Sequence, residues 1–160
     1  MNKNSLLPLL ALGLGPATAQ LSARCLFVGF SDGTASRPVS YTSKCSVSDQ
    51  GEAKVCSQLD LSHCLKNSNG SLSPSGEANA GNFKQTCPSC HVEDKGKKLF
   101  CVCQRQDRTF GNTSVDLDNV ITVKEGEGVL TCSTTVGQKM TECPITRLGK
   151  PPKRQQDFVA

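Results

Sequence analysis

Short segments with alternating apolar and polar residues are separated by clusters of turn residues along most of this chain. The clusters include Ser31-Asp32-Gly33, Asn67-Ser68-Asn69-Gly70 and Glu125-Gly126-Glu127-Gly128. Glycine, asparagine and aspartate favour tight turns, and no helical period of apolar positions persists between the clusters. We expect strands at Leu21–Val28, Val39–Val47, Asn82–Gln85, Lys98–Arg105 and Val129–Thr131. The pattern predicts a small all-β domain.

The N-terminal residues follow a different pattern. A largely apolar run from Leu6 to Leu14 follows the basic residue Lys3 and precedes the small residues Ala17-Thr18-Ala19. This arrangement is typical of a secretory signal peptide, predicted at residues 1–19. The run is shorter than the ~20 residues that span a bilayer. We therefore expect a secreted, extracellular chain without a membrane span.

All ten cysteines follow that segment, and an even number in a secreted chain predicts disulfides. Cys87-Pro88-Ser89-Cys90-His91 and Cys101-Val102-Cys103 also suit a zinc site or a redox pair. An oxidising compartment argues against both of these alternatives, so we expect no metal and no cofactor.

A short pattern occurs twice in the middle of the chain. Asp60 and Asp116 each stand between an apolar residue and a leucine, and each is followed at the same distance by a turn glycine, Gly70 or Gly126. Such an aspartate can cap a short helical turn, whose apolar side chains then pack inward. The pattern predicts two copies of one supersecondary unit and makes these aspartates structural rather than catalytic.

Further segments extend the repetition. The second copy contains Gly81–Cys87, Phe100–Arg105 and Thr113–Ile121, and the first matches it through Leu21–Cys25, Tyr41–Cys45 and Leu59–Leu65. In order and spacing these segments resemble the cyanovirin-N homology (CVNH) family of sugar-binding proteins. The resemblance covers residues 20–132, with repeat one at about 20–80 and repeat two at about 81–132. It implies two tandem pseudosymmetric repeats that form one intertwined, disulfide-rich domain, followed by a partly disordered C-terminal extension at residues 133–160.

The resemblance also implies a lectin that binds mannose-type glycans or glycoproteins, without catalysis. One family pocket falls on Asn67, Asn69, Asn82, Thr86, Arg105 and Gln106. The other falls on Gln20, Ala23, Arg24, Ser46, Ser48, Val123 and Glu125, where Ala23 and Val123 replace polar residues, so we expect it to be weak or lost. The chain has no Trp and one Tyr, which agrees with recognition by hydrogen bonds.

The same resemblance implies the disulfides Cys25–Cys45 and Cys87–Cys103. Facing positions of an antiparallel hairpin have a nearly constant index sum, which places Cys90 opposite Cys101 if a local bulge absorbs one residue. By proximity alone, we pair Cys56 with Cys64 and Cys132 with Cys143.

An alternative function remains open. The chain could be a secreted, disulfide-stapled effector or interaction protein that keeps the fold and binds no sugar. Asn69-Gly70-Ser71 and Asn112-Thr113-Ser114 are glycosylation sequons, and a glycan on Asn69 would block the first pocket. The net charge of +4 with short basic clusters argues against nucleic acid, and intertwined repeats allow either a monomer or a domain-swapped dimer.

Overall fold

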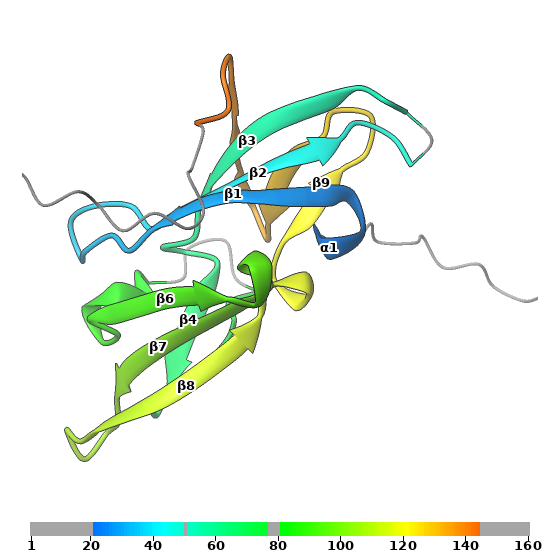
Figure 1. Cartoon of the computed structure of the whole chain (residues 1–160). Coiled ribbons are helices and arrows are strands. Elements are labelled where there is room, and N and C mark those ends of the chain that lie inside the picture. The colour runs from blue at the N-terminus through cyan, green and yellow to red at the C-terminus, as the bar shows by residue number, and fades with distance from the viewer. Residues whose placement is uncertain (1–20, 50, 77–80, 145–160) are drawn as a thin grey trace, which may run out of the picture.

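A computed structural model describes residues 21–49, 51–76 and 81–144 of the chain. The signal peptide predicted at residues 1–19, Gln20 of the second pocket and the end of the C-terminal extension lie outside the described residues. The described part consists mainly of short antiparallel strands in two groups (Figure 1).

The first group is built on a four-stranded sheet in the order β1-β2-β3-β12. Its strands are β1 (Cys25–Ser31), β2 (Ser40–Ser46), β3 (Lys54–Asp60) and β12 (Gln138–Met140). A second sheet packs on β3 through its strand β10, and it consists of β9 (Thr122–Lys124), β10 (Val129–Cys132) and β11 (Thr135–Val136). The sheet of the first repeat is therefore covered by a hairpin from the second repeat.

In the other group, the second repeat supplies the sheet and the first repeat supplies the hairpin that covers it. A three-stranded sheet contains β6 (Ser89–Glu93), β7 (Lys98–Gln104) and β8 (Phe110–Asp116), all from the second repeat. The hairpin β4 (Leu65–Ser68) and β5 (Ser71–Pro74), from the first repeat, packs on β7 and β8. Figure 1 shows β4 in the lower half beside β6, β7 and β8, and β9 in the upper half beside β1, β2 and β3. The fold is the all-β, intertwined pair of repeats that the sequence predicted.

Within each group, a matched hydrogen bond joins the two repeats. Leu72 of β5 donates its backbone N–H to the Thr113 hydroxyl at 3.0 Å, and Leu130 of β10 donates to the Ser57 hydroxyl at 3.1 Å. Each bond runs from a hairpin of one repeat to the last long strand of the other repeat's sheet. The two bonds are therefore equivalent under the pseudosymmetry that relates the repeats.

The repeated aspartates are caps, as predicted. The Asp60 side chain accepts from the Ser62 N–H at 2.9 Å, and the Asp116 side chain accepts from the Asp118 N–H at 2.9 Å. Asp116 begins the short 3₁₀ helix η3 (Leu117–Asn119). The apolar residues of both capped turns are completely buried, and these are Leu61, Leu65, Leu117 and Ile121.

Some predicted strands are different elements. Residues Leu21–Arg24 form the helical turn α1, whose Ser22 N–H donates to the Asp118 carboxylate at 2.7 Å. The predicted strand Asn82–Gln85 is instead the 3₁₀ helix η1 (Phe83–Gln85), because the Asn82 side chain caps it at the Lys84 N–H. A further 3₁₀ turn, η2 (Asp94–Gly96), connects β6 and β7.

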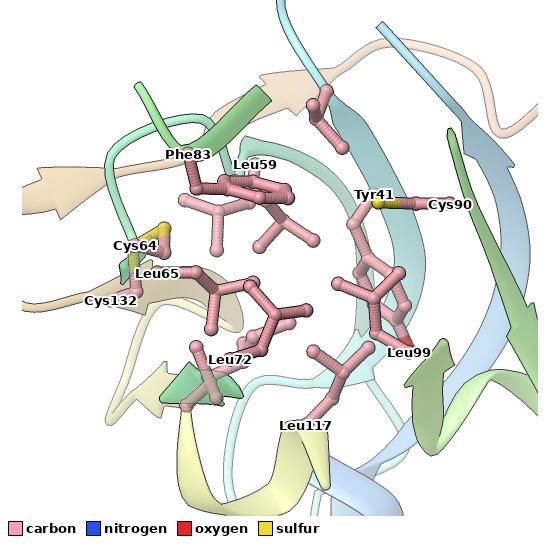
Figure 2. Close-up of a cluster of buried hydrophobic side chains, with 14 of the residues drawn as sticks. Tyr41, Leu59, Cys64, Leu65, Leu72, Phe83, Cys90, Leu99, Leu117 and Cys132 are labelled. Carbon is pink, nitrogen blue, oxygen red and sulfur yellow. A yellow bond between two sulfur atoms is a disulfide. The ribbon is translucent and has the colours of Figure 1, made fainter. Parts of the chain in front are cut away.

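The core lies between the two groups and draws on both repeats. Figure 2 shows Tyr41, Leu59, Leu65 and Leu99 pointing toward one another, with the Cys64–Cys132 disulfide at one side. The Tyr41 hydroxyl donates to the Gly96 carbonyl at 3.0 Å, and burial raises the pKa of this phenol to about 12. The side chain with the largest aromatic surface in the core is thus kept neutral and hydrogen-bonded.

Three predicted disulfides are confirmed and two are wrong. Cys25–Cys45, Cys87–Cys103 and Cys90–Cys101 are present, and Cys90 lies directly opposite Cys101 in the sheet. Proximity in sequence failed for the other cysteines, which pair as Cys56–Cys143 and Cys64–Cys132. Cys56 lies in extended β3 opposite Met140 of β12, so the chain after β12 reaches it, whereas Cys64 follows the capped turn and lies beside the end of β10.

The residues after 132 contribute to the fold as well. β11 extends the β9–β10 hairpin, β12 pairs with β3, and Cys143 is held by its disulfide to Cys56. Within the described residues, no helix is long and apolar enough to cross a membrane.

Candidate functional site

The turn of the β4–β5 hairpin, from the first repeat, lies against the second repeat at the edge of the β6-β7-β8 sheet. Asn67, in β4, makes the connection: its side-chain Nδ2 donates to the Thr86 hydroxyl at 3.0 Å and to the Gln104 carbonyl at 2.8 Å. Its Oδ1 accepts from the Gly70 N–H at 2.8 Å, which fixes the hairpin turn. Asn67 therefore determines where the turn sits relative to Thr86.

Asn69 links the same turn to the loop between β7 and β8. It adopts a left-handed backbone conformation, with φ of 51°, and its side-chain oxygen accepts from the Gln106 N–H at 2.9 Å. Asparagine tolerates this conformation better than most residues. The turn and the loop thus form one continuous exposed surface that carries both side chains.

Arg105 lies flat between two glycines. A Cβ atom on Gly70 would come within 2.6 Å of the Arg105 Cγ, and one on Gly111 would come within 2.5 Å of its Nη2. Any larger residue at either glycine would displace the arginine. The guanidinium is held at the exposed edge of the site, where Nη1 also approaches the Thr109 hydroxyl at 3.5 Å.

The loop that carries Arg105 and Gln106 is fixed by its own hydrogen bonds. The Arg105 N–H donates to the Thr109 carbonyl at 2.8 Å, and the Thr109 N–H donates to the Asp107 carboxylate at 2.9 Å. The Thr109 hydroxyl also donates to that carboxylate at 2.6 Å, which is the main reason why the pKa of Asp107 is lowered. The loop therefore favours the charged form of this carboxylate.

Asn82 has different contacts from the other predicted site residues. Its side chain caps η1 and donates to the Ala35 carbonyl at 3.3 Å, in the long β1–β2 loop. The structure thus brings Asn67, Asn69, Thr86, Arg105 and Gln106 together and places Asn82 at the start of the short helix that leads to Thr86.

Lys84 anchors that helix, and its role was missed in the sequence. Its side chain is completely buried and donates to the Asp32 carboxylate at 2.6 Å and to the Pro88 carbonyl at 2.9 Å. The other Asp32 oxygen accepts from the Cys90 N–H at 2.9 Å. No local signal predicts this pair, because a distant loop supplies the partner.

The second predicted pocket, which is the pseudosymmetric counterpart of this site, contains Arg24. This residue is only 8% exposed, and its guanidinium forms ion pairs with Glu125 and Asp49 and donates to the Ser46 carbonyl at 2.9 Å. Ala23 is exposed and Val123 is buried. Here the buried Arg24, paired with two exposed carboxylates, joins the turn after β9 to the first sheet, in the position where the other repeat presents exposed polar groups.

The exposed cluster around Asn67 offers hydroxyl, amide and guanidinium groups on a shallow surface. Such groups can donate to and accept from the vicinal hydroxyls of a sugar. All ten cysteines are in disulfides, so no thiolate is available as a metal ligand. Among the described residues, no group of three or more His, Cys, Asp or Glu side chains is placed to hold a metal ion.

Two intertwined repeats with a shallow polar site where they meet are the architecture of a class of carbohydrate-binding β domains. The sequence model of the CVNH domain matches residues 30–138. The chain therefore belongs to the CVNH family, whose members are lectins. No curated protein matches the sequence.

Several solved structures are similar to this chain. A crystal structure of a MoCVNH3 variant (Mo0v) in complex with (N-GlcNAc)4 is 17% identical with a TM-score of 0.54, and the match covers 74% of this chain and 99% of that chain. The microvirin:mannobiose complex is 23% identical with a TM-score of 0.49, over 68% of this chain and 95% of that chain. GzCVNH from Gibberella zeae is 20% identical with a TM-score of 0.49, over 67% and 93%. At 17% identity, the similarity to the MoCVNH3 variant concerns the fold alone.

Proposed function

We propose that this chain is a secreted lectin that binds mannose-type glycans through one polar pocket. The pocket consists of Asn67, Asn69, Thr86, Arg105 and Gln106, and Asn82 positions its edge. The observation that carries the proposal is the contact of the β4–β5 turn with the β7–β8 loop, because it gathers polar side chains from both repeats on one exposed surface.

The chemistry of the cluster favours a sugar over other small ligands. A pyranose presents adjacent hydroxyls, each able to donate and accept, and the pocket supplies donors and acceptors of matching kind. The guanidinium of Arg105 can donate to two neighbouring hydroxyls at once, since its N–H groups diverge in one plane. The (N-GlcNAc)4 ligand of the MoCVNH3 variant agrees with an oligosaccharide as the ligand class, and the choice of mannose follows from the family resemblance.

The disulfides support secretion. Five bridges join all ten cysteines, and such a pattern forms in oxidising compartments. Together with the predicted signal peptide, this supports a lectin that acts outside the cell, where glycoprotein and cell-wall glycans are accessible.

One observation favours the alternative of an interaction protein without sugar binding. Asn69 is the acceptor residue of a sequon and also lies in the pocket. A glycan attached there would cover the site. The disulfide-linked domain would then bind a protein partner instead of a sugar.

A glycan array with the purified chain tests the proposal. We expect binding to oligomannose structures, with loss of signal in Arg105→Ala and Thr86→Ala. Arg37→Ala is the matched control, because Arg37 is an exposed arginine in the β1–β2 loop. An array on which the full chain binds no glycan, in the form that carries Ser71→Ala, would exclude the lectin, because this variant removes the sequon and keeps Asn69.

A further inference from the structure

The outer face of the β6-β7-β8 sheet carries a groove that the proposed pocket does not use. The groove has a volume of about 320 Å³. Its lining side chains alternate with the buried cysteines of the same strands and include Ser89, His91, Glu93, Phe100, Val102 and Asn112. It therefore lies on the side of the sheet that faces away from the core.

The floor of the groove is aromatic. The His91 ring stacks on the Phe100 ring, with centroids 5.5 Å apart and planes inclined by 13°. At one end, the Lys98 ammonium lies 5.6 Å from the Phe100 centroid. Phe110, two positions before Asn112 on β8, is 53% exposed and belongs to the same face. Apolar rings that lie together on an exposed sheet face often mark a surface that a ligand, a partner or a modification covers.

Asn112 lies on this face, midway along the edge strand β8. It is directly opposite Val102 in the sheet, and Phe100 faces Ser114 at the next position on the same side. Diagonal neighbours of this kind lie within reach of long side chains. Phe100, Val102 and Phe110 therefore surround the Asn112 side chain.

Asn112 is also the first residue of the sequon Asn112-Thr113-Ser114. Asn112 and Ser114 are exposed, while the intervening Thr113 turns to the other side and accepts a hydrogen bond from Leu72. The amide to be modified and the hydroxyl that defines the sequon thus share the face that carries the groove.

We propose that Asn112 carries an N-linked glycan whose first sugars lie in the groove lined by His91 and Phe100. The proposal rests on the secretion proposed above. In the transfer, the Asn112 amide nitrogen forms a bond to C1 of the first N-acetylglucosamine of a lipid-diphosphate-linked oligosaccharide. The C1–O bond to the diphosphate breaks, the lipid diphosphate leaves, and the amide proton passes to a base of the oligosaccharide transferase.

The groove suits such an occupant. A sugar ring has an apolar face of C–H groups, which packs against aromatic rings, and a rim of hydroxyls, which Ser89 and Glu93 can bind at the wall of the groove. The covalent link holds the sugar beside the rings, so little further binding energy is needed. The glycan would also lie beside the free edge of β8, which is the last strand of its sheet.

Peptide mapping of the full chain, directed through the secretory pathway of a eukaryotic cell, tests the modification. We expect the peptide with Asn112 to carry a glycan, to lose it in Ser114→Ala and to keep it in Ser114→Thr. Asn69→Gln removes the other sequon and is the matched control. An unmodified Asn112 in the secreted chain would overturn the proposal, whatever the glycan array shows for the separate pocket.

A thermal unfolding cycle tests the groove. Ser114→Ala removes the glycan, and we expect it to lower Tm by several degrees in the parent chain and to leave Tm unchanged in the Phe100→Ala background. An equal decrease in both backgrounds would show that the sugars do not lie on Phe100 and would overturn that part of the proposal.

Discussion

Lys84 of the second repeat and Asp32 of the first form a buried ion pair, with the Nζ and Oδ1 atoms 2.6 Å apart. The lysine side chain is completely buried, whereas the aspartate side chain remains 29% exposed. The loop before β2 is thereby attached to the helix η1, which leads directly to Thr86. The packing of one repeat on the other and the position of the proposed pocket depend on the same contact.

This asymmetry predicts unequal effects of the two partners. Asp32→Asn leaves the buried ammonium without its counter-charge, which should decrease the free energy of unfolding by about 3 kcal/mol or more. Lys84→Met leaves an aspartate that water can reach, so we expect a smaller decrease. Urea unfolding of both variants measures the difference, and equal effects would show that the ion pair is not buried in solution.

The buried phenol of Tyr41 predicts a loss of stability in alkali. Burial raises its pKa from 10.0 to about 12, so the folded state holds the proton more tightly than the unfolded state. The resulting contribution is complete below about pH 10 and is lost as the pH rises toward the folded-state pKa, with a total of roughly 2–3 kcal/mol. Urea midpoints measured at increasing pH should fall more steeply for the parent chain than for Tyr41→Phe. Parallel curves would contradict this assignment.

The disulfide that joins the two repeats should contribute more than the local bridges. Cys64–Cys132 closes a loop with a sequence separation of 68, compared with 11 for Cys90–Cys101. The chain-entropy model assigns the longer loop about 4 kcal/mol. Replacing both Cys64 and Cys132 by alanine should therefore lower the urea midpoint more than replacing Cys90 and Cys101. Non-reducing peptide maps supply the control, since a Cys56–Cys64 peptide in the parent would refute this pairing.

Gly111 offers a probe of Arg105 that leaves the guanidinium chemistry intact. A methyl group at this position would displace the end of a flexible side chain, and the glycine does not have a positive φ. We expect Gly111→Ala to weaken glycan binding by about tenfold with little change in the urea midpoint. Gly81→Ala is the control, because this glycine has no positive φ and nothing crowds an added Cβ. Unchanged affinity in Gly111→Ala would mean that the position of the guanidinium does not matter.

The elements that could be predicted from the sequence are those that local chemistry determines. Asp60 and Asp116 cap their turns because the side chain reaches an N–H group only two residues away. The cross-strand disulfide Cys90–Cys101 followed from the register of one hairpin. The gathering of Asn67, Thr86 and Arg105 followed from the family resemblance, since spacing alone does not place the β4–β5 turn against the other repeat.

The features that were missed depend on contacts between distant segments. β3 and β8 carry few apolar residues, and they are strands because the neighbouring strands and the opposite hairpin pair and pack with them. The partner of Cys56 is determined by β12, which the polar sequence after residue 132 did not predict. Asp32 and Lys84 are 52 residues apart, so no sequence window contains both.

The central claim is that the cluster around Asn67 and Arg105 binds a mannose-type glycan. Isothermal titration calorimetry with an oligomannose glycan tests it, on the chain with Ser71→Ala, which excludes a blocking modification and keeps Asn69. We expect one site per chain, with affinity at least tenfold lower in Arg105→Ala, since a hydrogen bond from a charged group contributes roughly 1.5–3 kcal/mol, and unchanged in Arg37→Ala. The same affinity in both arginine variants, or no heat of binding in any of them, would contradict it.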